Sequence, residues 1–262
     1  MSTAAASDRW AVLAAWRALR DRFREGHRAL APGAWRAWLL TMAIGIATLL
    51  GVMVVLMTVA QRLLAAGRLD WESAFLQRLG SDGPFSFASG VFFQTFGTDI
   101  TLVILVGAAA SAAAWTRRPV TALSIVLAPL VADLVGRFGW ALWDRARPDV
   151  LHGGLASPGF HAFPSGHTSK TTAAYGFLAL LWILASRSIL ERMLAVLLLL
   201  AIITATALGR MTIGVHWPSD IAGGFLLGAA WLAVLGYGLR FERYTASSRT
   251  PPPPDSTARV AR

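Results

Sequence analysis

Long uncharged stretches alternate with short polar and basic connections along this chain. A transmembrane helix needs about 20 mainly apolar residues, and six stretches reach or approach that length. They cover residues 38–60, 100–115, 120–142, 168–185, 193–208 and 221–239. The pattern therefore predicts an all-α, polytopic membrane protein, built as a bundle of six transmembrane helices.

The connections are uneven in length and character. Residues 61–83 are mixed and polar, which indicates an external loop with room for an interfacial helix. Residues 84–98 are aromatic and uncharged, and aromatic side chains concentrate at membrane interfaces. We expect this segment to dip into the membrane or to lie along it. Residues 144–163 are rich in Gly and Pro and are predicted to form a loop.

Three regions follow from this pattern. Residues 1–36 contain seven arginines and no long apolar run. Apolar residues at helical spacing beside these arginines predict either an amphipathic helix on an anionic membrane face or a solvated basic segment. Residues 37–240 form the six-helix membrane domain. Residues 241–262, with four consecutive prolines, are predicted to be a disordered tail.

Composition supports the membrane assignment and excludes several kinds of chemistry. Of the 262 residues, 55% are hydrophobic and 15% are charged, against about 25% charged in soluble domains. The net charge of +10 comes almost entirely from arginines near the predicted membrane edges. Anionic lipid, and not nucleic acid, is therefore the expected partner. The absence of cysteine excludes disulfides, thiolate nucleophiles and cysteine-bound metals.

Residues 209–220 carry the clearest candidate chemistry. They place Arg210, His216 and Asp220 in fixed order between two apolar stretches. Histidine can act as a nucleophile or a proton carrier near neutral pH. Asp220, four residues later, could hold one ring nitrogen and leave the other free to react.

Two further motifs precede this one. Pro164-Ser-Gly-His167 stands just before the stretch at 168–185, and Arg145-Ala-Arg147-Pro148 lies before that. Together the motifs supply two histidines, a carboxylate and several arginines but no thiol. This combination favours phosphate chemistry. A helix-capping role for His216 and Asp220, or an anchoring role for the arginines at the membrane edge, is the structural alternative.

Topology places the three motifs together. Six spans put both termini on one side, which also carries the arginines of the short connections and of the N-terminal segment. The positive-inside rule makes this side cytoplasmic, in the inner (plasma) membrane. All three motifs then lie at the opposite, periplasmic or extracellular interface, where they could form one site.

The motifs resemble the signature of the type-2 phosphatidic acid phosphatase family, which also contains vanadium haloperoxidases. That signature is a Lys followed after six residues by Arg-Pro, then Pro-Ser-Gly-His, then Ser-Arg, five residues, His, three residues and Asp. This chain matches at Arg147-Pro148, at 164–167, and at Arg210, His216 and Asp220 with both spacings intact. The resemblance covers roughly residues 38–239.

Two positions depart from the signature. Trp140 stands at the lysine position and Gly209 at the serine position. Arg137 or Arg145 is hypothesised to supply the missing cation. If Arg137 only pairs with Asp133, its substitution would harm folding before phosphate binding. The missing serine hydroxyl would be one phosphate donor among several, so its loss is expected to matter less.

The resemblance implies a two-step reaction that needs no metal or other cofactor. His216 attacks phosphorus and forms a phosphohistidine, Asp220 orients His216, and His167 protonates the leaving oxygen and then activates water. Phosphoryl oxygens bear the negative charge during transfer.

The residues that bind those oxygens can be expected from their chemistry. Arg147 and Arg210 can each offer two parallel donors. Ser165 and the Gly166 amide stand where a helix begins, and free N–H groups are available there. Lys170 is interpreted as an interfacial anchor, with contact to a headgroup as the alternative.

The expected protein is a membrane phosphatase that removes a terminal phosphate from a lipid phosphate or diphosphate. Phosphatidic acid, phosphatidylglycerol phosphate and undecaprenyl diphosphate are the substrate types that the resemblance implies. A phosphotransferase using the same phosphohistidine is one alternative, and a non-catalytic protein that binds or moves anionic lipid is another. A vanadium haloperoxidase is disfavoured because those relatives are soluble. Neither the lipid nor the oligomeric state follows from the sequence.

Overall fold

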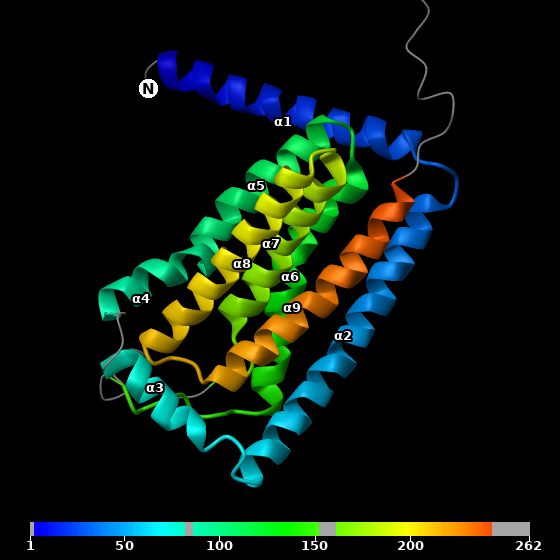
Figure 1. The fold of residues 1–262 in the computed structure, drawn as a ribbon. Helices are drawn as coiled ribbons and strands as arrows, with labels where there is room; N and C mark the ends of the chain where they lie inside the picture. Colours follow the sequence, from blue (N-terminus) through cyan, green and yellow to red (C-terminus); the bar gives the residue numbers. More distant parts are fainter. Residues whose placement is uncertain (1–2, 82–85, 152–160, 243–262) are drawn as a thin grey trace, which may run out of the picture.

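The computed structural model describes residues 3–81, 86–151 and 161–242, and these ranges are organised almost entirely as helices (Figure 1). The all-α prediction is confirmed. The elements are α1 Thr3–Ala29, α2 Ala34–Ala65, α3 Trp71–Ser81, α4 Phe87–Gln94, η1 Thr95–Gly97, α5 Asp99–Trp115, α6 Pro119–Leu142, α7 Gly166–Ala185, α8 Ile189–Thr212, α9 Pro218–Gly238 and η3 Leu239–Phe241. The predictions for the tail after residue 242 and for residues 152–160 of the loop lie outside the described residues.

Within the described residues, five helical stretches are long and apolar enough to cross a membrane. They are Ala34–Ala65, Phe87–Trp115, Pro119–Leu142, Ile189–Thr212 and Pro218–Phe241. The second stretch joins α4, η1 and α5, so the aromatic segment lengthens the short apolar run predicted at 100–115. Large apolar side chains such as Ile100, Val103 and Leu197 are exposed, as expected for helices that face lipid tails. These features confirm a polytopic helical membrane protein.

The remaining predicted span, α7, is less apolar than the other five. It can carry polar side chains in its first turns because they are buried inside the protein. Its first turns bury a run of Thr, Ser and Lys side chains from Thr168 to Thr172. The helix packs against α6, α8 and α9 and lies near the centre of the bundle (Figure 1). Polar side chains within a membrane bundle usually face its interior and mark a functional region.

Small residues bring α7 and α9 into close contact. A Cβ added at Gly224 would lie 2.5 Å from the Ser165 carbonyl oxygen, and one added at Gly228 would lie 2.6 Å from the Ser169 carbonyl oxygen. Glycines four residues apart allow helix backbones to approach closely in membrane proteins. The beginnings of α7 and α9 are thereby held side by side, and both carry motif residues.

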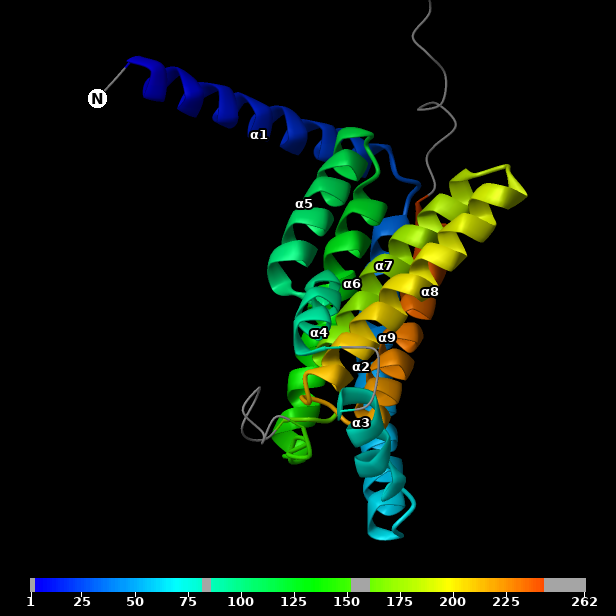
Figure 2. The ribbon, with the colours of Figure 1, turned by 60° about the vertical axis from the view of Figure 1, so that its left-hand side comes forward.

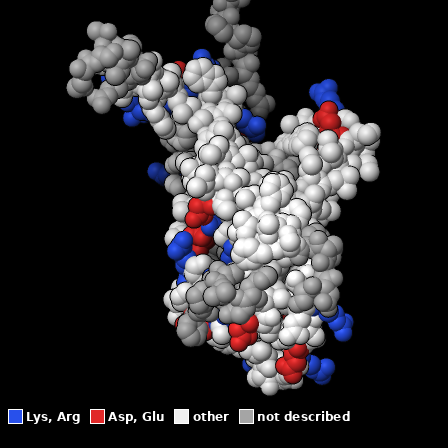
Figure 3. Space-filling view, turned by 90° about the vertical axis from the view of Figure 1, so that its left-hand side faces the viewer, with Lys and Arg blue, Asp and Glu red and all other residues white. Residues whose placement is uncertain are grey.

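The helices run in alternating directions, which gathers the motifs at one end of the bundle. The ends of α6 and α8, the beginnings of α7 and α9, and helix α3 share that end, whereas α1 crosses the opposite end (Figures 1 and 2). There Glu25 pairs with Arg117 at 2.8 Å. On the face shown in Figure 3, charged side chains gather toward the two ends and in one mixed group on the flank.

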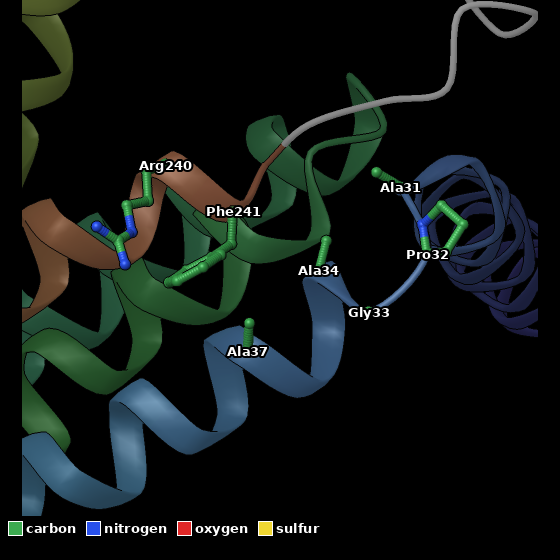
Figure 4. Close-up of a pocket in the computed structure, with 7 residues that line it drawn as sticks. All are labelled: Ala31, Pro32, Gly33, Ala34, Ala37, Arg240 and Phe241. Carbon is green, nitrogen blue, oxygen red and sulfur yellow. The ribbon is translucent and has the colours of Figure 1, made fainter.

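The N-terminal segment forms a helix, as one of the two predicted alternatives requires. Trp10, Leu13 and Trp16 of α1 are exposed, in a helix that leaves the bundle (Figure 2). At its junction with α2 lies a hollow of about 510 Å³, lined by Ala31, Pro32, Gly33, Ala34, Ala37, Arg240 and Phe241 (Figure 4). This hollow is at the end of the bundle away from the motifs, and its lining contains no histidine or carboxylate.

Candidate active site

His216 lies at the centre of the motif end, in the turn between α8 and α9. Its side chain is 2% exposed, and its Nδ1 is 2.8 Å from the Ala162 carbonyl oxygen. A carbonyl oxygen only accepts hydrogen bonds, so Nδ1 carries the proton. The other ring nitrogen, Nε2, then keeps its lone pair. The protein fold thus selects the tautomer in which Nε2 can act as a nucleophile.

Asp220 stands beside His216 without bonding to it directly. The distance from its Oδ2 to Nδ1 of His216 is 3.6 Å, longer than a good hydrogen bond. Its Oδ2 accepts from the Trp217 amide at 2.8 Å, and its Oδ1 accepts from Arg145 Nη1 at 2.5 Å. The sequence suggested that Asp220 would hold the ring. In the structure the Ala162 carbonyl is the direct partner, and Asp220 supplies a nearby negative charge and caps α9.

Arg210, at the end of α8, presents one edge of its guanidinium to His216. Its Nη1 donates to Gln94 Oε1 at 2.5 Å, and its Nη2 lies 3.5 Å from Nε2 of His216. Its Nε is buried and has no hydrogen-bond partner within the described part of the chain. An edge made of Nε and Nη2 can donate two parallel hydrogen bonds to a phosphoryl group. This edge adjoins the nitrogen that would attack.

The surroundings of Gly209 explain why glycine replaces the serine of the family signature. A Cβ at this position would lie 2.7 Å from both the Gly90 carbonyl oxygen and the Gln94 amide nitrogen of α4. No side chain fits there unless the α4 backbone moves. The glycine therefore lets α4 approach α8 and brings Gln94 to Arg210. Gln94 was not identified from the sequence, because it lies 116 residues from its partner.

The electrostatics around His216 favour an anion. Burial, and then the charges of Arg210 and Arg147, lower the pKa of His216 well below its usual value. Burial also lowers the pKa of Arg147, which lies close enough to interact with Asp220. With His216 neutral, the two guanidinium groups give its surroundings a positive charge that favours a phosphate.

The beginning of α7 supplies the remaining motif residues. Ser165 is fully buried and caps the helix, accepting from the Thr168 amide at 3.4 Å, and its own amide donates to the Asp220 carbonyl oxygen at 3.0 Å. Gly166 is the first helical residue. His167 interacts electrostatically with Arg210 and His216. The predicted residues of the second and third motifs therefore come together.

Trp140, at the lysine position of the family signature, makes a structural contact. Trp140 Nε1 donates to the Pro164 carbonyl oxygen at 3.1 Å, and the indole lies against Gly166. Arg137, one of the two proposed substitutes, pairs with Asp133 at 2.7 Å and is 58% exposed. Trp140 therefore supports the loop that precedes α7. Arg137 pairs with Asp133, which was the structural alternative to phosphate binding.

The other cations near the site also have carboxylate partners. Arg145 donates to Asp220 and, at 2.9 Å, to Glu72. This pairing favours a positioning role over phosphate binding. Lys170 is buried and lies 2.5 Å from Asp99 and 3.2 Å from Asp133, unlike the interfacial anchor predicted for it. Among residues 3–81, 86–151 and 161–242, no three His, Asp or Glu side chains are grouped to bind a metal.

Comparison with known proteins supports the motif assignment. The family model described as the PAP2 superfamily matches residues 120–243. Two curated proteins, from the CDC 1551 / Oshkosh and H37Rv strains of Mycobacterium tuberculosis, are 34% identical over 111 residues; both are named decaprenylphosphoryl-5-phosphoribose phosphatase. The match covers 42% of this chain and about half, 54%, of each relative. No solved structure matches.

Proposed function

We propose that the chain, whose residues 120–243 match the PAP2 superfamily model, belongs to the type-2 phosphatidic acid phosphatase family and is an integral membrane lipid phosphatase. The observation that carries the proposal is the state of His216: its Nδ1–H is directed to the Ala162 carbonyl, and Nε2 adjoins the available edge of Arg210. A neutral nucleophile beside a two-donor anion site suits phosphoryl transfer.

The proposed first step forms a covalent intermediate. Arg210 and Arg147 bind the phosphoryl oxygens, with the Ser165 hydroxyl and Gly166 amide as further donors. Nε2 of His216 forms a bond to phosphorus while the bond from phosphorus to the lipid oxygen breaks. The phosphorylated ring becomes cationic because Nδ1 keeps its proton. The Asp220 carboxylate, 3.6 Å from Nδ1, stabilises that positive charge.

His167 is proposed to manage protons in both steps. It enters the first step as the imidazolium and donates a proton to the departing lipid oxygen, which leaves as an alcohol or as a lipid phosphate. His167 is then neutral. It then takes a proton from water, which attacks phosphorus and breaks the bond to Nε2. Inorganic phosphate leaves, and both histidines return to their starting states. This cycle needs no metal ion.

The substrate is proposed to be a lipid with a terminal phosphate. Phosphatidic acid, phosphatidylglycerol phosphate and undecaprenyl diphosphate remain candidates, and the name of the relatives adds a polyprenyl-linked sugar phosphate. We propose that six helices, including α7, cross the inner membrane, that both termini are cytoplasmic, and that the site opens at the opposite interface. Arginine-rich α1 at the end of the bundle away from the site supports this orientation (Figure 1).

A direct test is phosphate release by the purified protein in detergent with excess chelator, from a panel of these lipids. His216→Ala should abolish release. His167→Ala should be tested with a phosphate ester whose leaving group needs no proton. That variant should then accumulate the phosphoenzyme, seen as one added phosphoryl group in intact mass, because water activation is impaired.

Each outcome has a clear meaning. Release by the native protein and none by His216→Ala supports the proposal. Release that persists in His216→Ala would contradict the assignment of the nucleophile. Phosphate transfer only to an added alcohol would indicate a phosphotransferase, and lipid binding without turnover in any condition would indicate a non-catalytic lipid-binding protein.

A further inference from the structure

Glu72 of α3 is a buried carboxylate that reaches the active-site end from outside the matched family segment. It is 1% exposed, which is costly for a charged group unless it is fully paired. Its Oε2 accepts from Arg145 Nη2 at 2.9 Å, and its Oε1 accepts from the Ser219 amide at 2.6 Å. Both carboxylate oxygens therefore bind neighbours of Asp220: Arg145, which donates to it, and Ser219, which precedes it in the chain.

Arg145 connects Glu72 to both groups beside Nδ1 of His216. Its Nη1 donates to Asp220 Oδ1 at 2.5 Å. Its carbonyl oxygen accepts from the amide of Ala162 at 3.0 Å, and the carbonyl of Ala162 in turn accepts from His216. One arginine thus fixes the acceptor that sets the tautomer of the ring and the carboxylate that faces the ring.

Aromatic rings and a hydroxyl hold the guanidinium of Arg145 in addition to the two carboxylates. It lies 5.7 Å from the Trp143 ring centroid and 5.6 Å from that of Trp217, distances typical of cation–π contacts. Its Nη1 also donates to the Ser219 hydroxyl at 2.7 Å. Without Glu72, one carboxylate would remain for this cation, and its Nη2 would lose its partner.

We propose that Glu72 is a positioning residue for the nucleophile: it fixes Arg145, which holds Asp220 and Ala162 in the places that keep Nε2 of His216 reactive. The inference rests on the proposed phosphatase function and assigns Glu72 no contact with substrate. Its predicted effect is on the chemical step, because a displaced Asp220 stabilises the phosphohistidine cation less well. Substrate binding, through Arg147 and Arg210, should change little.

The test compares Glu72→Gln with Glu72→Asp and with Asp70→Asn. Glu72→Gln removes the charge and one acceptor, whereas Glu72→Asp keeps the carboxylate. Asp70 is an exposed acidic residue two positions earlier that lines the same hollow as Arg145 but is not one of its hydrogen-bond or ion-pair partners, so Asp70→Asn is the matched control. Phosphate release should be measured as kcat and KM, with thermal unfolding followed on the same samples.

We expect Glu72→Gln to lower kcat by about 10–100-fold with KM nearly unchanged, the loss seen when a supporting partner of a functional histidine is removed. Glu72→Asp should recover part of this loss, and Asp70→Asn should match the native protein. A folded Glu72→Gln variant with native kcat, or one in which only KM rises, would overturn the inference. A native protein with no phosphatase activity would overturn the proposed function, and this inference with it.

A second variant keeps the test decisive if Glu72→Gln does not fold. Ser219→Ala removes the hydroxyl that Arg145 contacts at 2.7 Å but keeps the amide that binds Glu72. Loss of one such hydrogen bond is worth about 1 kcal/mol, or roughly fivefold. The variant should lower kcat by about that factor with KM unchanged. A native kcat in Ser219→Ala would count against the positioning role.

Discussion

Restoring the family serine at position 209 should damage this protein. A substitution that restores a signature residue is usually expected to raise stability or activity. Here Gly209 faces the backbone of α4, and a Cβ would lie 2.7 Å from two backbone atoms and 3.1 Å from the Phe93 carbonyl carbon. Backbone atoms cannot turn aside as the tip of a flexible side chain can, so Gly209→Ser must displace α4.

The size of the effect follows from two opposing contributions. Overpacking a close contact costs about 1–3 kcal/mol, while replacing glycine within a helix by alanine gains up to about 1 kcal/mol. Because backbone atoms block the Cβ, the overpacking cost should lie in the upper part of that range, about 2–3 kcal/mol. The net loss for Gly209→Ala is then about 1–2 kcal/mol, and Gly209→Ser should lose at least as much. At roughly 2–4 °C for each kcal/mol in a chain of this size, the melting temperature should fall by roughly 2–8 °C.

Activity should fall for a separate reason. A displaced α4 withdraws Gln94 from Arg210, whose Nη1 then loses its acceptor. The Nε and Nη2 edge is no longer fixed beside His216. We expect kcat/KM to fall about tenfold, which corresponds to about 1.4 kcal/mol of transition-state stabilisation. Gln94→Ala should reproduce the loss of activity with a smaller loss of stability, because it leaves the backbones of α4 and α8 in contact.

The assay combines thermal unfolding in detergent with lipid phosphate release. Gly107→Ala is the matched control, because Gly107 lies within α5 and a Cβ there would meet nothing within 4 Å. That variant should be as stable as the native protein or slightly more so. A Gly209→Ser variant that matches or exceeds the native protein in both measurements would show that α4 does not need a glycine at position 209.

Three further predictions concern the charges of the site. Because burial and the adjacent arginines lower the pKa of His216, its neutral form persists at lower pH, and the acidic limb of the kcat/KM profile due to His216 should lie below pH 6.5. An NMR titration of the His216 ring in the native protein with its midpoint at or above pH 6.5 would contradict this. Arg210→Lys should lower kcat/KM by about 100-fold or more, because lysine lacks the paired donors. Arg137→Gln should lower kcat/KM by less than about fivefold, since its exposed ion pair is worth up to about 1 kcal/mol; equal losses in the two variants would refute the distinction. Excess chelator should leave phosphate release unchanged, and a loss restored by added divalent cations would contradict the proposed reaction.

Local sequence signals were sufficient to predict the helices and the motif residues. Apolar stretches extend over whole helices, so their existence and approximate limits are readable without knowledge of tertiary contacts. The spacing of Arg210, His216 and Asp220 is likewise fixed within one turn between two helices. What spacing could not indicate is the acceptor at Nδ1 of His216. That acceptor is a backbone carbonyl 54 residues away, and every residue has one.

The same limitation explains the residues that the sequence left ambiguous. An arginine near a phosphate motif can bind phosphate or pair with a carboxylate, and its own position does not distinguish the two. For Arg145 the answer depends on Glu72, 73 residues earlier. The role of Trp140 depends on a contact with the Pro164 carbonyl. Each is decided by packing between elements far apart in the chain.

The partners Gln94 and Glu72 both lie before residue 120, and this bears on the role of the first half of the chain. The segment that matches the PAP2 superfamily begins at residue 120 and contains His167, Arg210, His216 and Asp220. Yet Arg210 is fixed by Gln94 of α4, and Arg145 is fixed by Glu72 of α3. If these helices served only to anchor the protein in lipid, the buried Glu72 and the partly buried Gln94 would impose a desolvation cost with no benefit to the site. Their pairing with arginines of the candidate site indicates that α3 and α4 help to build it, so the substitutions that would most clearly separate the proposed catalysis from anchoring lie before residue 120.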